Sequence, residues 1–160
     1  MSNFVKDSIQ ETLKATSYKM DEMSALESVF FRKKVLEKFT AGKDHRALWE
    51  VTKASEFAVR DSNACDWLDE FLQLDECYIF FDKGDDTTIY IFPENQSISK
   101  FLSEFPGYVF YLTNESLDYL ICFNDSDYLI ALGTAEPWLR DKAKELSKSG
   151  WVDMDGKNYL

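Results

Sequence analysis

The chain has little of what metal sites and common active sites are built from. Its 160 residues include one histidine, three cysteines and no CxxC pair. A zinc site typically needs four Cys or His ligands in clustered pairs, so a zinc site is not expected. The sequence also lacks a GxGxxG turn, a Walker loop, a GxSxG elbow and an HExxH helix. We therefore expect no cofactor and no enzymatic activity.

The remaining polar motifs favour surface structure over chemistry. His45 lies in the charged stretch GKDHR and is expected to be a surface residue. A catalytic or metal-bound histidine needs an orienting carboxylate or co-ligands, which the spacing of this sequence does not suggest. The stretch Asp82–Asp86 has the wrong spacing for a calcium loop and has Lys83 in its middle. It and the stretch 124–127 are typical of turns, because Asx side chains bond nearby backbone N–H groups.

Long apolar runs are missing too. No run approaches the roughly 20 residues that span a bilayer, and the first residues lack a basic segment followed by an apolar one. Cys65, Cys77 and Cys122 are odd in number and are expected to be reduced core thiols, with one disulfide plus a free thiol as the alternative. These features predict a cytoplasmic protein that does not bind membranes.

Basic residues are scarce in the middle of the chain. Between Asp61 and Asp127 there are fifteen acids and two bases, Lys83 and Lys100, a net charge of −13 that is larger than the −11 of the whole chain. Such a surface repels nucleic acid and anionic lipid and attracts basic partners. Aromatic residues of the same segment could stack on bases, but without Lys and Arg to neutralise phosphates they are better explained as core.

Apolar residues, at 45% of the chain, are sufficient for a core, and no linker or repeat is visible. We expect a single domain over residues 1–160, with 150–160 as a tail. Helices are expected over 3–15, from the Ser24–Glu27 capping box to Gly42, after Asp61, from Pro93 to Phe105, and after Thr134. Strands are expected over 56–59, 77–81, 87–92, 108–113, 118–123 and 128–133. This order predicts an α+β fold with a five- or six-stranded, largely antiparallel (mixed) sheet and helices packed around it.

In the second helix, Leu26, Val29, Phe30 and Leu36 are expected to form one apolar stripe, with Phe31, Val35 and Phe39 beside it. The same helix carries four basic residues, Arg32, Lys33, Lys34 and Lys38. We interpret them as a solvated face, or as positive charge that balances the acidic part of the chain.

The run YVFYLTNESLDYLICFNDSDYLIALGTAEPWL, residues 108–139, resembles the C-terminal meander and helix of the SUKH (Smi/Knr-like) immunity-protein superfamily. The resemblance implies an α+β domain that protects a bacterial cell by binding a toxin, often a nuclease, without catalysis. It supplies no catalytic residues. The acidic surface agrees with this expectation, because nuclease toxins present basic substrate-binding surfaces.

The leading hypothesis is thus a protein that binds a basic partner, possibly a toxin nuclease domain. Seven acids in the loops between strands are the candidate partner-binding residues: Asp82, Asp85, Asp86, Glu115, Asp118, Asp125 and Asp127. The alternative is a small-ligand-binding domain or small enzyme with a pocket between sheet and helices, lined by Tyr90, Tyr111, Tyr119 and Trp138. A homo-oligomeric regulatory protein is a third possibility, and the sequence leaves the oligomeric state open.

Overall fold

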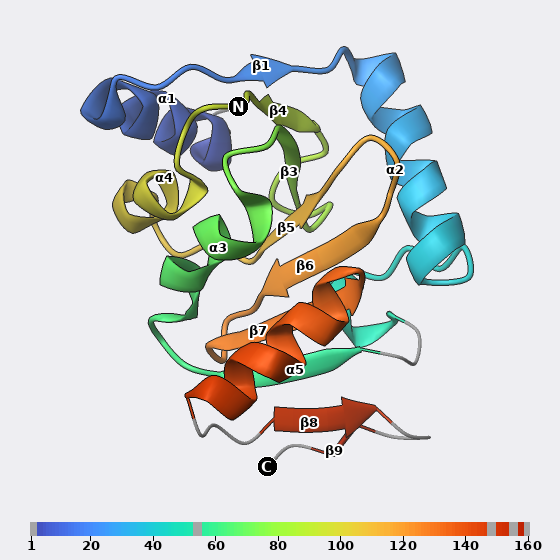
Figure 1. Cartoon of the computed structure of the whole chain (residues 1–160). Coiled ribbons are helices and arrows are strands. Elements are labelled where there is room, and N and C mark those ends of the chain that lie inside the picture. The colour runs from blue at the N-terminus through green and yellow to red at the C-terminus, as the bar shows by residue number, and fades with distance from the viewer. Residues whose placement is uncertain (1–2, 53–55, 147–149, 154–156, 159–160) are drawn as a thin grey trace.

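The structure is a computed structural model that describes residues 3–52, 56–146, 150–153 and 157–158. Over these residues the chain forms one antiparallel sheet with five α-helices packed around it, which confirms the expected α+β class (Figure 1). The helices are α1 (Phe4–Thr16), α2 (Ala25–Phe39), α3 (Leu68–Leu72), α4 (Ile98–Glu104) and α5 (Ala135–Glu145). Two short 3-10 turns, η1 (Leu48–Glu50) and η2 (Ala64–Trp67), lie between α2 and α3 in the chain.

The sheet has more strands than the five or six expected. In the described part of the chain it contains seven strands of three or more residues, and a two-residue strand at each edge. Their spatial order is β1-β4-β3-β5-β6-β7-β2-β8-β9, and every neighbouring pair is antiparallel. The strands are β1 (Asp21–Glu22), β2 (Phe57–Arg60), β3 (Cys77–Phe81), β4 (Tyr90–Phe92), β5 (Phe110–Thr113), β6 (Tyr119–Phe123), β7 (Tyr128–Gly133), β8 (Gly150–Asp153) and β9 (Lys157–Asn158).

Short polar turns produce the β5-β6-β7 meander at the centre of the sheet. In the β6–β7 turn, Asn124 Oδ1 accepts hydrogen bonds from the N–H groups of Ser126 and Tyr128, both at 3.0 Å. In the β5–β6 turn, Asn114 Oδ1 accepts the N–H of Asp118 at 2.9 Å. These side chains replace backbone acceptors inside the turns, so each turn fixes the register of the strands that it joins.

Each face of the sheet carries its own core. Cys77, Ile79 and Phe81 point to the face covered by α1, α3, α4 and α5, whereas Tyr78 and Phe80 point to the face covered by α2 and the η1 segment. Side chains alternate along a strand, so a strand buried on both faces must be apolar at every position. This is why CYIFF reads as a continuous apolar run.

Helix α2 turns a different stripe toward the sheet than expected. Its capping box is confirmed: the Ser24 hydroxyl accepts the N–H of Glu27, and Glu27 accepts the N–H of Ser24. The buried apolar residues are Phe31, Val35, Leu36 and Phe39. Leu26, Val29 and Phe30 are exposed, so the prediction that they share a core stripe with Leu36 is wrong.

Three boundaries also differ from expectation. The helix expected to open at Pro93 begins at Ile98, because the Ser97 hydroxyl accepts the N–H of Lys100 at 3.0 Å and so forms the cap. The strand expected over 87–92 covers only β4. Residues 150–160, expected to be a tail, contain β8, which pairs with β2, and β9.

Candidate partner-binding surfaces

The sheet separates the seven candidate acids into two groups at opposite ends. Phe81 pairs with Phe110, and Phe110 pairs with Phe123, so the loop after β3 and the β6–β7 turn lie at one end of the sheet. That end, the β6–β7 end, holds Asp82, Asp85, Asp86, Asp125 and Asp127. The β5–β6 turn, with Glu115 and Asp118, lies at the opposite end, the β5–β6 end, next to the residues that precede β3.

Asp82 is an internal hydrogen-bond acceptor and is 9% exposed. Its Oδ1 accepts the N–H of Leu48 at 3.0 Å and the hydroxyl of Tyr111 at 2.7 Å. Burial raises the pKa of this carboxyl above its usual value, and the two hydrogen bonds partly oppose that rise. Asp82 therefore ties η1 to the sheet and is not available as an exposed contact.

Asp86 is also buried, at 6% exposure. One carboxylate oxygen accepts the N–H of Thr88 at 3.0 Å, and the other accepts the hydroxyl of Tyr90. This carboxylate shapes the loop between β3 and β4, so its bonding capacity is used within the fold.

Two of the exposed acids of the β6–β7 end share a cleft with one basic residue, Arg46. Asp85 and Asp125 line a shallow cleft of about 340 Å³ together with Arg46, Trp49 and Glu50. Opposite charges inside one cleft reduce its net potential, so this end is a weaker attractor of a basic partner than its acid count suggests.

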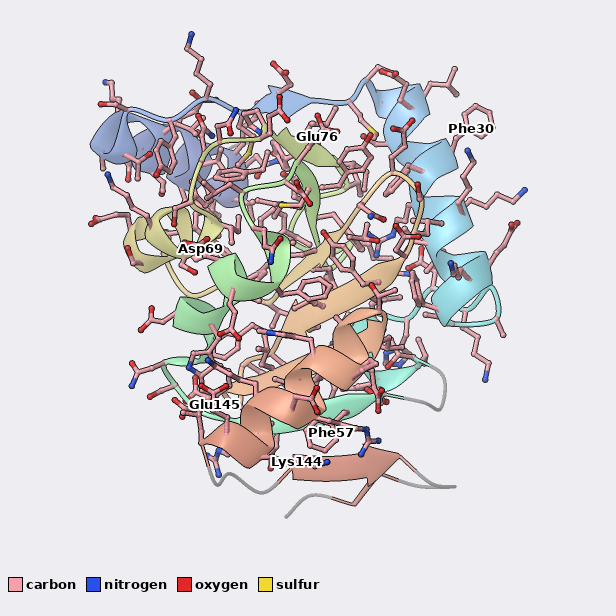
Figure 2. All side chains as sticks on the ribbon, viewed as in Figure 1. Phe30, Phe57, Asp69, Glu76, Lys144 and Glu145 are labelled. Atoms are coloured by element: carbon pink, nitrogen blue, oxygen red, sulfur yellow. The ribbon has the colours of Figure 1, made fainter. Side chains whose placement is uncertain are left out.

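The β5–β6 end is more uniformly acidic. Asp75, Glu76, Glu115 and Asp118 are all exposed there, and none makes a salt bridge among the described residues. Glu76, which directly precedes β3, is labelled in Figure 2. Asp75, Glu76 and Asp118 line a hollow of about 210 Å³ whose other lining residues include no Lys or Arg. We call these four acids the β5–β6 acidic surface.

The acids of this surface contribute to raised pKa values of two neighbouring tyrosines. Burial, then Glu115 and Glu76, raise the pKa of Tyr78. Burial also raises the pKa of Tyr119, and among the further causes are Asp75 and Asp118. A nearby negative charge disfavours a phenolate, so both shifts have the sign expected beside unneutralised carboxylates.

Asp75 and Glu76 were not singled out by sequence reasoning. They sit at the end of a helical segment, where charges usually mark a solvated face. One sequence signal could have found them: both directly precede the apolar run of β3, so they lie at one end of the sheet. The β5–β6 turn lies at the same end, because β5 pairs with β3.

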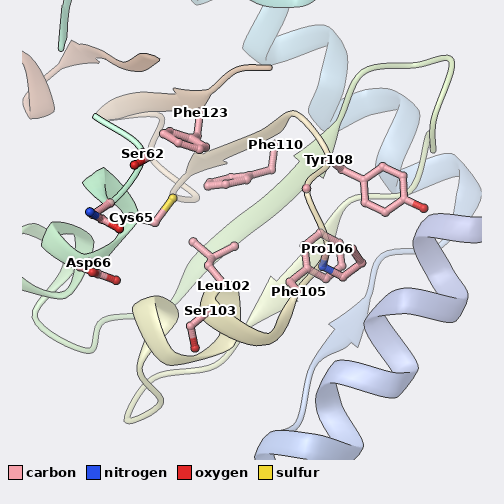
Figure 3. A pocket seen from close by; sticks show the side chains of 12 residues that line it. Ser62, Cys65, Asp66, Leu102, Ser103, Phe105, Pro106, Tyr108, Phe110 and Phe123 are labelled. Atoms are coloured by element: carbon pink, nitrogen blue, oxygen red, sulfur yellow. The ribbon is translucent and has the colours of Figure 1, made fainter. Parts of the chain in front are cut away.

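The tyrosines expected to line a ligand pocket do not do so together. Tyr90 and Tyr111 are fully buried in the two cores, Tyr119 borders the β5–β6 hollow, and Trp138 packs on Phe71. A different cleft, of about 310 Å³, lies between η2, α4 and the strand ends (Figure 3). Cys65, Leu102, Phe110 and Phe123 converge on it.

That cleft does not contain an activated nucleophile. Burial, with smaller contributions from Asp66 and Asp127, raises the pKa of the Cys65 thiol to about 12. The Ser103 hydroxyl donates to the carbonyl of Lys100 at 2.7 Å. A thiol with so high a pKa is protonated at neutral pH and is a poor nucleophile.

Metal and membrane sites are likewise not evident in the described residues. These residues contain no group of three or more His, Cys, Asp or Glu placed to hold a metal ion. His45 is exposed, with Nδ1 3.6 Å from a carboxylate oxygen of Glu50. None of the described helices combines the length and the apolar character needed to cross a membrane.

Comparison with known proteins gives no relative. No family model, no curated protein and no solved structure matches the chain. The resemblance to the SUKH superfamily therefore stays a prediction from residues 108–139.

Proposed function

We propose that this protein is a non-enzymatic binding module that recognises a basic surface on a partner protein through the β5–β6 acidic surface. The observation that carries the proposal is that Asp75, Glu76 and Asp118 line one hollow that has no Lys or Arg in its lining, with the exposed Glu115 at the same end of the sheet. Charges left unpaired in the free protein can be matched by a partner, and their summed field speeds association.

The rigid setting of these acids supports binding by a preformed surface. Asp118 accepts a hydrogen bond from the side-chain amide of Asn114 at 2.8 Å, and its own N–H donates to Asn114 Oδ1. Asp75 donates its N–H to the carbonyl of Leu72 at 2.9 Å. Backbone already fixed before association adds no ordering cost on binding.

The partner that we propose is the nuclease-type domain of a bacterial toxin, with the protein acting in immunity. Support comes from the SUKH resemblance and from charge: a nuclease needs a basic face to bind phosphates, and an acidic surface can cover that face. The same acidic character disfavours direct nucleic-acid binding.

The test is binding to the nuclease domain of a toxin encoded beside this gene, by titration calorimetry over a salt series. Neutralising the surface with Asp75→Asn, Glu76→Gln and Glu115→Gln is expected to weaken binding at least about tenfold and to flatten its salt dependence. The matched control, Asp85→Asn, Asp125→Asn and Asp127→Asn, removes the same charge from the β6–β7 end and should change affinity much less. Equal losses in both variants, or a complex insensitive to salt, would contradict the proposal.

A second candidate function is small-ligand binding in the cleft of Figure 3. The observation that favours it is the aromatic lining from Phe105, Tyr108, Phe110 and Phe123, in a volume at the lower end of typical ligand sites. A fragment screen followed by NMR tests it. Chemical-shift changes confined to these four residues would support ligand binding, and their absence would remove this alternative.

A further inference from the structure

Helix α2 presents an apolar face that the fold leaves uncovered. Leu26, Val29 and Phe30 are 66%, 63% and 57% exposed. Residues three and four apart are neighbours on a helix, so the three side chains form one contiguous patch. Figure 2 shows Phe30 projecting away from the molecule on the outer side of α2. Exposed apolar patches of this kind mark interaction sites on proteins.

The patch has no role in holding α2 to the sheet. The opposite side of the helix anchors it to the sheet. Its buried residues are Phe31, Val35, Leu36 and Phe39, and they belong to the core between α2 and the sheet. The ring of Phe31 packs edge-on against Tyr78, with centroids 4.9 Å apart. Internal packing thus explains one side of the helix only.

Charges are arranged along the exposed side with a definite direction. Glu27 lies in the first turn, beside Leu26, and the exposed Lys33, Lys34 and Lys38 lie in the second half, which also holds the exposed Glu37. At about 100° per residue, Glu27 and Lys34 lie on one flank of Phe30, and Leu26 and Lys33 lie on the other. If a second α2 packs antiparallel about a two-fold axis at Phe30, residue 27 therefore faces residue 34 of the other copy, and residue 26 faces residue 33. Glu27 of each copy then meets Lys34 of the other, and the stem of Lys33 covers Leu26.

We propose that α2 is a self-association surface, through which two copies of this chain pair antiparallel about a two-fold axis near Phe30. A two-fold interface must be self-complementary, because each surface element meets its own copy. The patch meets this requirement in both respects: its apolar centre can face itself, and Glu27 and Lys34 lie on one flank at opposite ends of it. The surface includes none of the four residues of the β5–β6 acidic surface, so it goes beyond the proposed function.

The axis position gives a geometric test by disulfide trapping. At the wider end of the usual separation of packed helices, about 10 Å, the Cα atoms of facing residues lie about 5 Å apart, which a disulfide can span. Phe30→Cys is therefore expected to form a covalent dimer under mild oxidation. The matched control is Glu37→Cys on the same exposed side, whose copies would lie about 21 Å apart along the helix pair. Native cysteines contribute little background, because Cys77 and Cys122 are buried and Cys65 is half-buried.

Sedimentation velocity of the native chain over a concentration series supplies the second readout. We expect mass to rise toward two chains, and Phe30→Glu to weaken association at least about tenfold, because it places two like charges at the axis. Phe30 is exposed, so this variant is expected to fold normally. Equal trapping at positions 30 and 37, a native chain that stays monomeric throughout, or a dimer unaffected by Phe30→Glu would each overturn the proposal. The variants of the β5–β6 acidic surface should dimerise as the native chain does.

Discussion

The hydroxyl of Tyr111 donates a 2.7 Å hydrogen bond to Oδ1 of Asp82 and accepts the backbone N–H of Trp49 at 3.0 Å. Asp82 also accepts the N–H of Leu48. These three bonds join the end of β3, the middle of β5 and the η1 turn in one buried network, and they hold the segment after α2 against the sheet.

Removing the hydroxyl of this network should destabilise the fold. Tyr111→Phe leaves the N–H of Trp49 without this acceptor and takes one donor from Asp82. An unsatisfied buried polar group costs about 1–3 kcal/mol, so we expect a loss of that size in the free energy of unfolding, measured in urea. The control is Tyr108→Phe, whose hydroxyl makes no hydrogen bond within the described part of the chain and whose ring packs on Phe81 and Phe105. Equal stability of the two variants would contradict the role of the network.

The raised pKa of Asp82 predicts an acid dependence of stability. A carboxyl whose folded-state pKa lies above its unfolded value, near 3.8, binds its proton more tightly in the folded protein. Its contribution to the free energy of unfolding therefore falls as pH rises from the unfolded pKa through the raised one. Asp82→Asn keeps an acceptor oxygen but cannot ionise. The unfolding free energy of the native chain minus that of Asp82→Asn should fall across this range, and a difference that is constant with pH would refute the assignment.

Gly133 is required where β7 meets the β5–β6 turn. Its φ is +67°, and a Cβ added there would lie 2.3 Å from the carbonyl oxygen of Asp118. Gly133→Ala is expected to cost at least about 2 kcal/mol of unfolding free energy, because left-handed backbone strain adds to the clash with rigid backbone. Gly107→Ala is the matched control, since a Cβ there meets nothing within 4 Å. Similar melting temperatures for the two variants would contradict this prediction.

Thiol reactivity gives a prediction about the folded core. Burial raises the pKa of Cys65 to about 12 and raises that of Cys77 further. Because thiolates are the reactive form, both thiols should react with a disulfide reagent at pH 8 far more slowly than in denaturant. The measurement is the rate of thiol release with and without urea. Fast labelling of Cys65 in the folded protein would show that its environment is more polar than described.

The periodicity of the sequence predicted where the helices and strands lie in the chain better than it predicted which side of a helix faces the sheet. The strands of the meander and the start of α2 agree with the sequence, because turn chemistry and the capping box are local signals. The exposed stripe of α2 is different: apolar residues occur on both sides of this helix, and Phe30 and Phe31 are adjacent. Only the shape of the sheet decides which side packs, and that is a tertiary property.

The candidate site shows the same limit. Asp82 and Asp86 look like solvated loop residues in the sequence, but tyrosine hydroxyls bind both of them. Tyr111 lies 29 positions from Asp82, so nothing local indicates the bond. Asp75 and Glu76 become part of an acidic surface only because β3 is placed next to β5.

The position of β2 between β7 and β8 has a consequence for synthesis. Its Phe57 pairs with Ala131 of β7, so a ribosome adds 74 further residues before that partner exists, which takes roughly 4 to 15 s at usual elongation rates. During this interval the apolar residues of FAVR have neither sheet neighbour. The nascent chain is therefore most exposed to intermolecular strand pairing at this segment, and a chaperone that shields it would be expected to raise the yield of folded protein.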